Sequence, residues 1–138
     1  SGEKMILDAT APSDLTVEVN VDFLGEAQAG DAGILLRTSG AALGYDAQRG
    51  YFAGLVPKSG LVIFGKTDGT KWTEICRTET RIDVSAPQRL RVEAQGDRFT
   101  VLLNGKTALT AQDASFATGS IGLRVVDTHA TFSNIRIE

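Results

Sequence analysis

The sequence has very few of the residues that build metal sites or covalent cross-links. It contains one cysteine, Cys76, and one histidine, His129, among 138 residues. A lone cysteine excludes an intrachain disulfide and any zinc site built from several thiolates. A single histidine cannot hold a metal ion without several carboxylate or carbonyl partners, so a surface turn is the simplest assignment for His129.

An excess of positive charge and long apolar segments are also absent. Fourteen Lys and Arg residues stand against seventeen Asp and Glu residues, which gives a formal net charge of −3 at pH 7. The basic residues are scattered singly, whereas nucleic-acid binding needs a concentrated positive surface. The apolar runs, of about five residues, fall far short of the ~20 residues that cross a bilayer. We therefore expect neither a nucleic-acid partner nor a membrane partner.

Strict alternation of apolar and polar residues is what the sequence does have. Leu15–Phe23 carries aliphatic or aromatic residues at odd positions and polar residues at even positions, which is typical of a strand with one buried face. Turn dipeptides such as Asn104-Gly105 separate similar segments and predict antiparallel hairpins. Ten strands are expected: Met5–Ala9, Leu15–Phe23, Gly33–Arg37, Tyr51–Val56, Leu61–Lys66, Trp72–Thr78, Arg89–Gln95, Phe99–Leu103, Ser120–Val126 and Ala130–Ile137.

These segments predict an all-β domain, an antiparallel two-sheet β-sandwich of the jelly-roll type. The length suits one domain, residues 1–138, and the Ser1-Gly2 start suggests a module excised from a larger protein. Two longer loops are expected, Thr38–Arg49 and Thr107–Thr118, the second with a helical turn near Asp113–Phe116. Long loops on a rigid sandwich are frequent carriers of binding residues.

Five segments occur in the order seen in concanavalin A-like domains appended to glycoside hydrolases. They are AGILLR, GYFAGL, LVIFGKTDGTKWTEI, RLRVEAQGDRFTVLLNGK and FATGSIGLRVVDTHATFSNI. From Leu15 onward the chain resembles carbohydrate-binding module family 66, the fructan-binding module of levanase-type enzymes. The motifs AGhhhR and hNG, with h an apolar residue, also occur in laminin G-like domains and in a domain of unknown function linked to keto-glycoside hydrolases.

The resemblance implies a sandwich that binds terminal sugars beside a catalytic domain of the same polypeptide, in a secreted or cell-surface protein. It implies a small pocket of arginines and carboxylates on the concave face, to which we assign Glu18, Arg37, Arg124 and Asp127. Alternation also places both arginines on outward positions of buried strands, where a guanidinium can hold sugar hydroxyls or pair with a carboxylate.

Aromatic and loop residues complete the predicted binding set. Tyr45, beside Asp46 in a glycine-containing loop, and Tyr51 could stack on a sugar ring, while packing in the core is the better assignment for Trp72. His129 lies close enough in sequence to Asp127 to hydrogen-bond a ligand at the same loop end. No cofactor is required, although sandwiches of this kind often hold a structural calcium ion. The carboxylates that could bind calcium are Asp8, Asp22, Asp31 and Asp127.

Three functions from different classes follow from these observations. The first is a non-catalytic carbohydrate-binding module that brings a tethered glycosidase to its polysaccharide. The second is a structural or protein-interaction sandwich without a pocket. The third is catalysis, either as a glycoside hydrolase or as a keto-glycoside hydrolase-like enzyme. Glu18, Asn20 and Asp22 resemble the E-x-D-x-E series of laminarinase-type glucanases, but an amide replaces the central carboxylate, which disfavours a glycosidase.

Overall fold

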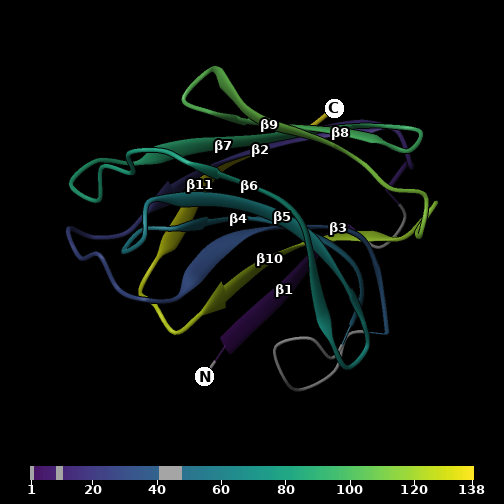
Figure 1. Cartoon of the computed structure of the whole chain (residues 1–138), viewed down its shortest axis with the longest axis horizontal. Helices are drawn as coiled ribbons and strands as arrows, with labels where there is room; N and C mark the ends of the chain where they lie inside the picture. The colour runs from purple at the N-terminus through teal and green to yellow at the C-terminus, as the bar shows by residue number, and fades with distance from the viewer. Residues whose placement is uncertain (1, 9–10, 41–47) are drawn as a thin grey trace.

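The computed structural model describes residues 2–8, 11–40 and 48–138, and this part of the chain is built from strands. The strands are β1 (Gly2–Asp8), β2 (Leu15–Asp22), β3 (Asp31–Ser39), β4 (Arg49–Val56), β5 (Leu61–Asp68), β6 (Trp72–Glu79), β7 (Gln88–Gln95), β8 (Arg98–Leu103), β9 (Lys106–Gln112), β10 (Ser120–Val126) and β11 (Thr131–Ile137). One antiparallel sheet has the order β1-β10-β3-β4-β5-β6, and the other has the order β11-β2-β7-β8-β9. In Figure 1 the two sheets are stacked, with β2, β7, β8 and β9 across the top.

The predicted all-β sandwich of two antiparallel sheets is therefore confirmed. The Val17, Val19 and Val21 side chains of β2 are fully buried against the opposite sheet, as the alternation predicts. The Asn104-Gly105 turn between β8 and β9 has positive φ at both residues, 52° and 84°. Positive φ at both central residues is typical of the type I′ turn, whose twist matches that of the two strands in a hairpin with a two-residue loop.

One element was assigned wrongly from the sequence. Thr107–Thr118 was expected to be a loop, whereas Lys106–Gln112 forms β9 at the edge of the five-stranded sheet. The helical turn expected near Asp113–Phe116 is not formed. In β9 only Leu109 is well buried, so the segment lacks the apolar periodicity that marks the inner strands.

A polar cluster closes the end of the sandwich over an aromatic core. The Tyr51 ring is fully buried, with its centroid 4.6 Å from the Phe99 ring and 5.5 Å from the Phe64 ring. Its hydroxyl donates to Asp113 Oδ1 at 2.7 Å, and Lys66 Nζ donates to Asp113 Oδ2 at 2.8 Å. These contacts fasten the β9–β10 connection to the six-stranded sheet.

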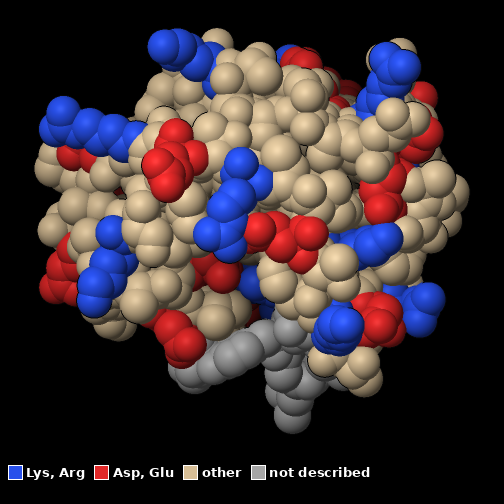
Figure 2. Space-filling model, viewed as in Figure 1, with Lys and Arg blue, Asp and Glu red and all other residues tan. Residues whose placement is uncertain are grey.

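The surface carries mixed charges. In Figure 2 lysines and arginines lie among aspartates and glutamates over the visible face. In the described part of the chain, no helix has the length and apolar character needed to cross a membrane.

Candidate functional site

Two aromatic rings pack on the outer face of the six-stranded sheet, where glycines leave room for them. A Cβ atom added to Gly54 would come within 2.4 Å of the Phe52 ring, and one added to Gly65 within 2.5 Å of the Trp72 ring. The two rings meet edge to face, with centroids 6.1 Å apart and an interplanar angle of 72°. They form an aromatic platform that is separate from the main core.

Arg124, from β10, lies on this platform. Its guanidinium carbon is 4.0 Å from the centroid of the Phe52 ring and 5.9 Å from that of Trp72, distances at which a cation is attracted to an aromatic face. Neighbouring ladder positions on β3 and β4 are Gly33 and Gly54, so the arginine has space to lie along the sheet. Only 5% of Arg124 is exposed.

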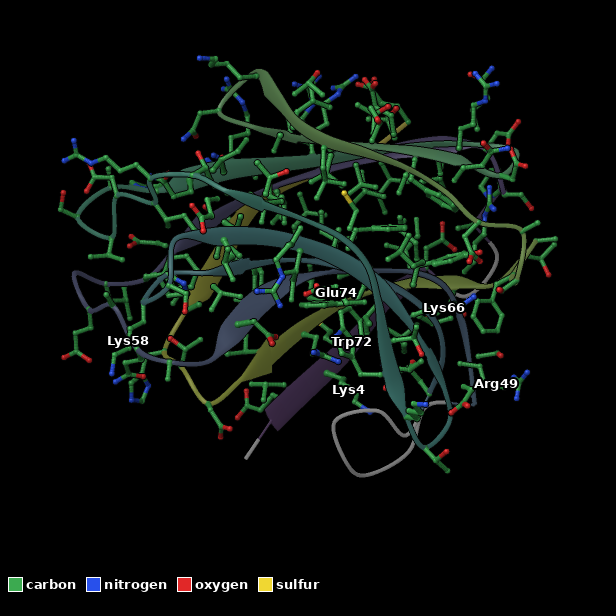
Figure 3. The ribbon with its side chains drawn as sticks, viewed as in Figure 1. Lys4, Arg49, Lys58, Lys66, Trp72 and Glu74 are labelled. Carbon is green, nitrogen blue, oxygen red and sulfur yellow. The ribbon has the colours of Figure 1, made fainter. Side chains whose placement is uncertain are left out.

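Fixed carboxylates border the same platform. Arg124 Nη2 lies 3.4 Å from both carboxylate oxygens of Asp31, on β3. On β6, Glu74 is opposite Gly65 in the ladder and accepts two hydrogen bonds from Arg77, at 2.8 and 2.9 Å. Figure 3 shows Trp72 and Glu74 in the same part of the view as Lys4, whose ladder partner on β10 is Arg124.

This arrangement has the chemistry of a site for a polyhydroxylated ligand. An aromatic ring can cover the apolar face of a sugar, while carboxylates accept hydroxyl protons and guanidiniums donate to hydroxyl oxygens. Because the arginines already hold the carboxylates, little side-chain ordering would oppose binding. We call Phe52, Trp72, Glu74, Arg124 and Asp31 the platform site.

Arg124 thus lies on the outer face of its sheet, as predicted, but Arg37 does not. A φ of 49° at Arg37 and a register shift between Leu36 and Ser39 reverse the alternation at the end of β3. The Arg37 guanidinium lies 5.0 Å from the centroid of the Phe99 ring and donates to the backbone oxygens of Ser13 and Phe116. Arg37 therefore ties the sandwich end together, and the prediction that it shares a face with Arg124 is wrong.

Glu18 also lies away from the platform site. It belongs to β2 and projects from the outer face of the five-stranded sheet, on the opposite side of the sandwich. Its carboxylate is 3.7 Å from Arg89 Nε and 3.9 Å from Arg91 Nη1. The prediction that Glu18 joins Arg124 in one pocket is wrong, because the two residues belong to different sheets.

The tyrosine predictions have different outcomes. Tyr51 cannot offer its ring to a sugar, since the ring is fully buried among core phenylalanines, so this prediction is corrected. Burial and the hydrogen bond with Asp113 raise the pKa of Tyr51 to about 12. Burial alone would raise the pKa of the Asp113 carboxyl, but hydrogen bonds from Lys66, Tyr51 and Ser115 hold it far below its usual value. Tyr45 and Asp46 lie outside the described residues.

Asp127 and His129 are exposed in the connection between β10 and β11. Asp127 follows β10 directly with a φ of 53°, and the roles of both residues in binding stay predictions. Calcium also stays a prediction: in the part of the chain that the structure describes, no three His, Cys, Asp or Glu residues are grouped closely enough to hold a metal ion.

Sequence reasoning missed most of the platform site. Trp72, which is predicted to pack in the core, is only half-buried, and Glu74 is absent from the predicted binding set. A signal was present, because Trp72 and Glu74 are two residues apart on one strand and therefore share a face. Asp31 was considered only as a calcium ligand, although it begins the same strand as the AGILLR motif.

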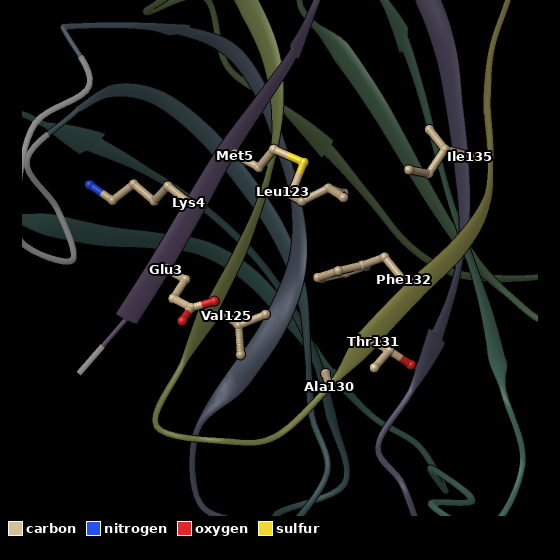
Figure 4. Close-up of a pocket in the computed structure, with 9 residues that line it drawn as sticks. All are labelled: Glu3, Lys4, Met5, Leu123, Val125, Ala130, Thr131, Phe132 and Ile135. Carbon is tan, nitrogen blue, oxygen red and sulfur yellow. The ribbon is translucent and has the colours of Figure 1, made fainter.

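A hollow, shown in Figure 4, lies between the edge strands β1 and β11. It has a volume of about 360 Å³, and its mainly apolar wall includes Met5, Leu123, Val125, Ala130, Phe132 and Ile135. A mainly apolar wall offers few partners for sugar hydroxyls, so this groove fits a polyhydroxylated ligand less well than the platform site does.

The whole chain matches the model of a known family. Residues 1–138 match the 3-keto-alpha-glucoside-1,2-lyase-like domain. The chain belongs to this family. It is also similar to the solved carbohydrate-binding module CBM66 from Bacillus subtilis, with 30% identity and a TM-score of 0.86 over 99% of this chain and 81% of that chain. The predicted resemblance to carbohydrate-binding module family 66 is confirmed.

Two further relatives place the domain in context. It is 32% identical over 137 residues to levanase of Bacillus subtilis strain 168, and it spans only 20% of that protein's length. Galectin-Ib of Xenopus laevis shares the fold, with a TM-score of 0.71 at 14% identity over the full length of both chains. The match to a binding module, and to a small part of a longer enzyme, supports the prediction that this domain is itself non-catalytic.

Proposed function

We propose that this domain is a non-catalytic carbohydrate-binding module that binds sugar at the platform site. The observation that carries the proposal is the stack of Arg124 on Phe52 beside Trp72, with carboxylates held at its border by arginines. This stack combines a sugar-stacking ring with charged hydrogen-bonding groups in fixed positions. The similarity to a carbohydrate-binding module supports the assignment.

The ligand we propose is the terminal sugar of a chain, with fructose of fructans as the first choice. The platform has one half-buried aromatic ring rather than a row of exposed rings, which favours a chain end over a long stretch of polysaccharide. The similarity to levanase supports fructans. In this proposal the domain accompanies a catalytic domain in a secreted or cell-surface polypeptide, and the tether supplies a high effective concentration of substrate.

Isothermal titration against levan, inulin, fructose and arabinose-containing oligosaccharides tests this function. We expect saturable binding to a fructan that weakens at least tenfold in Trp72→Ala and in Glu74→Gln. Lys58→Ala is the matched control, because Lys58 is exposed in the β4–β5 turn, far from Trp72 in Figure 3. Thermal unfolding of each variant shows whether lost heat reflects lost folding.

Two results of this titration would contradict the proposal. If folded wild-type protein produces no heat with any member of the panel, the proposed ligands are wrong. If the wild-type protein binds but Trp72→Ala and Glu74→Gln bind equally well, the platform site is not the binding site.

A further inference from the structure

A polar hollow lies on the outer face of the five-stranded sheet, on the opposite side of the sandwich from the platform site. Its volume is about 390 Å³, and its wall consists of Glu18, Asn20, Arg89, Asn134, Ile135 and Arg136. They come from three adjacent strands, β2, β7 and β11. A volume of this size falls within the ~300–1,000 Å³ typical of small-molecule sites.

A β-bulge shapes one wall of this hollow. Ser133 is opposite Asn20 and Arg136 is opposite Glu18, so two residues of β11, Asn134 and Ile135, stand against the single residue Val19 of β2. Asn134 has a φ of 52°, in the left-handed region that few residues other than glycine adopt. Bulges of this kind re-aim side chains and are frequent beside functional sites. Here the bulge brings both Asn134 and Ile135 to the hollow.

Most polar side chains that line the hollow form no hydrogen bond in the described part of the chain. Glu18 is mostly buried, with 17% of its side chain exposed, yet the neighbouring guanidinium nitrogens are 3.7 and 3.9 Å away, beyond hydrogen-bonding distance. Within the described part of the chain, no hydrogen bond is formed by the side chains of Asn20 or Asn134 or by the Arg89 guanidinium. The hollow therefore offers a carboxylate, two amides and a guanidinium to a ligand.

The charges define the class of ligand. Glu18 is balanced by Arg89, while Arg136 lies 3.3 Å from Glu138 and Arg91 lies 3.0 Å from Glu93. A nearly neutral wall with both donors and acceptors suits neighbouring hydroxyl groups better than it suits a phosphate or a carboxylate. Ile135, 41% exposed, adds an apolar surface for the carbon skeleton of a ring.

From this geometry we infer a second binding site, in the hollow around Glu18 and Asn134, for a neutral sugar ring. This site goes beyond the function proposed for the platform site. With sites on opposite faces, one domain can hold two chain ends of a branched polysaccharide, and two weak contacts then give higher avidity than either one alone.

Nuclear magnetic resonance tests this inference with the whole domain. A ¹⁵N-labelled sample is titrated with fructose and with short fructo-oligosaccharides of the levan and inulin types, and backbone amide shifts are followed. We expect one saturable set around residues 18–20, 89 and 134–136, and a second set around residues 72–74 and 124. Glu18→Gln with Asn134→Gly should weaken the first set at least fivefold and leave the second unchanged. Trp72→Ala should weaken the second set at least fivefold and leave the first unchanged.

Lys58→Ala is the control, because Lys58 is exposed in the β4–β5 turn and does not line the hollow. The inference is overturned if shifts occur only around Trp72, or if the Glu18 set disappears in Trp72→Ala. Shifts only around Glu18 would support the second site and contradict the platform site. An absence of shifts at either place would reject both sites for these sugars.

Discussion

At the scale of single residues, the two most buried arginines have different surroundings. Both are 5% exposed, and both lie over a phenylalanine ring. Arg37 donates to backbone oxygens at the end of the core, whereas Arg124 lies on the outer face beside Trp72. Burial alone therefore does not distinguish a structural arginine from one in the proposed platform site; the sheet face does.

This difference predicts separable effects of substitution. Arg37→Met leaves the oxygens of Ser13 and Phe116 without their donor, so we expect a loss of ~2–4 kcal/mol in the free energy of unfolding. Its affinity for sugar should stay within about twofold of wild type. Arg124→Met should lower affinity at least tenfold. Urea denaturation and calorimetric titration of both variants measure these effects, and equal loss of affinity in the two would contradict the assignment.

The Tyr51–Asp113 pair predicts how stability depends on pH. The pKa of Tyr51 is raised from 10.0 to about 12 in the folded state, so its contribution is complete below pH 10 and is lost as the pH rises towards 12. The pKa of Asp113 is lowered from 3.8, so its contribution is present above that pH and is lost as the pH falls below it. The free energy of unfolding should therefore decline at both extremes.

Urea denaturation of Tyr51→Phe and Asp113→Asn tests this dependence. The stability difference between wild type and Tyr51→Phe should shrink from pH 9 to pH 11, and that between wild type and Asp113→Asn should shrink from pH 5 to pH 3. A difference that stays constant across either interval would show that the hydrogen bond does not perturb the group concerned.

At the scale of strands, the outer face of the six-stranded sheet depends on glycines. Gly54→Ala would place a Cβ atom within 2.4 Å of the Phe52 ring, which must then tilt away and displace Arg124. We expect a loss of ~1–3 kcal/mol in stability and a clear loss of sugar affinity. Gly105→Ala, in the β8–β9 turn, is the control: it strains a residue with a φ of 84° but leaves the platform site intact. Unfolding and titration measurements that show unchanged affinity in Gly54→Ala would contradict the role of the platform.

Most strands could be predicted from the sequence. Which strands share a sheet, and which side chains share a face, could be predicted less well. Alternation identified β2, and the turn dipeptides marked the hairpins around Asn104, because these signals are local. The reversal at Arg37 was not predictable, since it depends on a bulge fixed by pairing with β4 and β10. The separation of Glu18 from Arg124 depends on which sheet each strand joins, and that is decided by contacts distant in sequence.

At the scale of the whole molecule, the two sheets enclose the main core, and their outer faces carry different arrays of side chains. The six-stranded sheet carries the platform site, and the five-stranded sheet carries the hollow around Glu18. Both arrays lie on paired strands rather than on long loops, so the sandwich supports their geometry. A surface supported in this way favours the proposed binding of sugar over a mechanism that needs large movements.

A crystal structure of the domain with a bound levan-type trisaccharide tests whether the platform site binds sugar. We expect the terminal fructose to contact the Trp72 ring, with its hydroxyls hydrogen-bonded to Glu74 and to Arg124 or Asp31. A trisaccharide bound in the apolar groove between β1 and β11, with the platform site unoccupied, would show that the platform site is not the binding site.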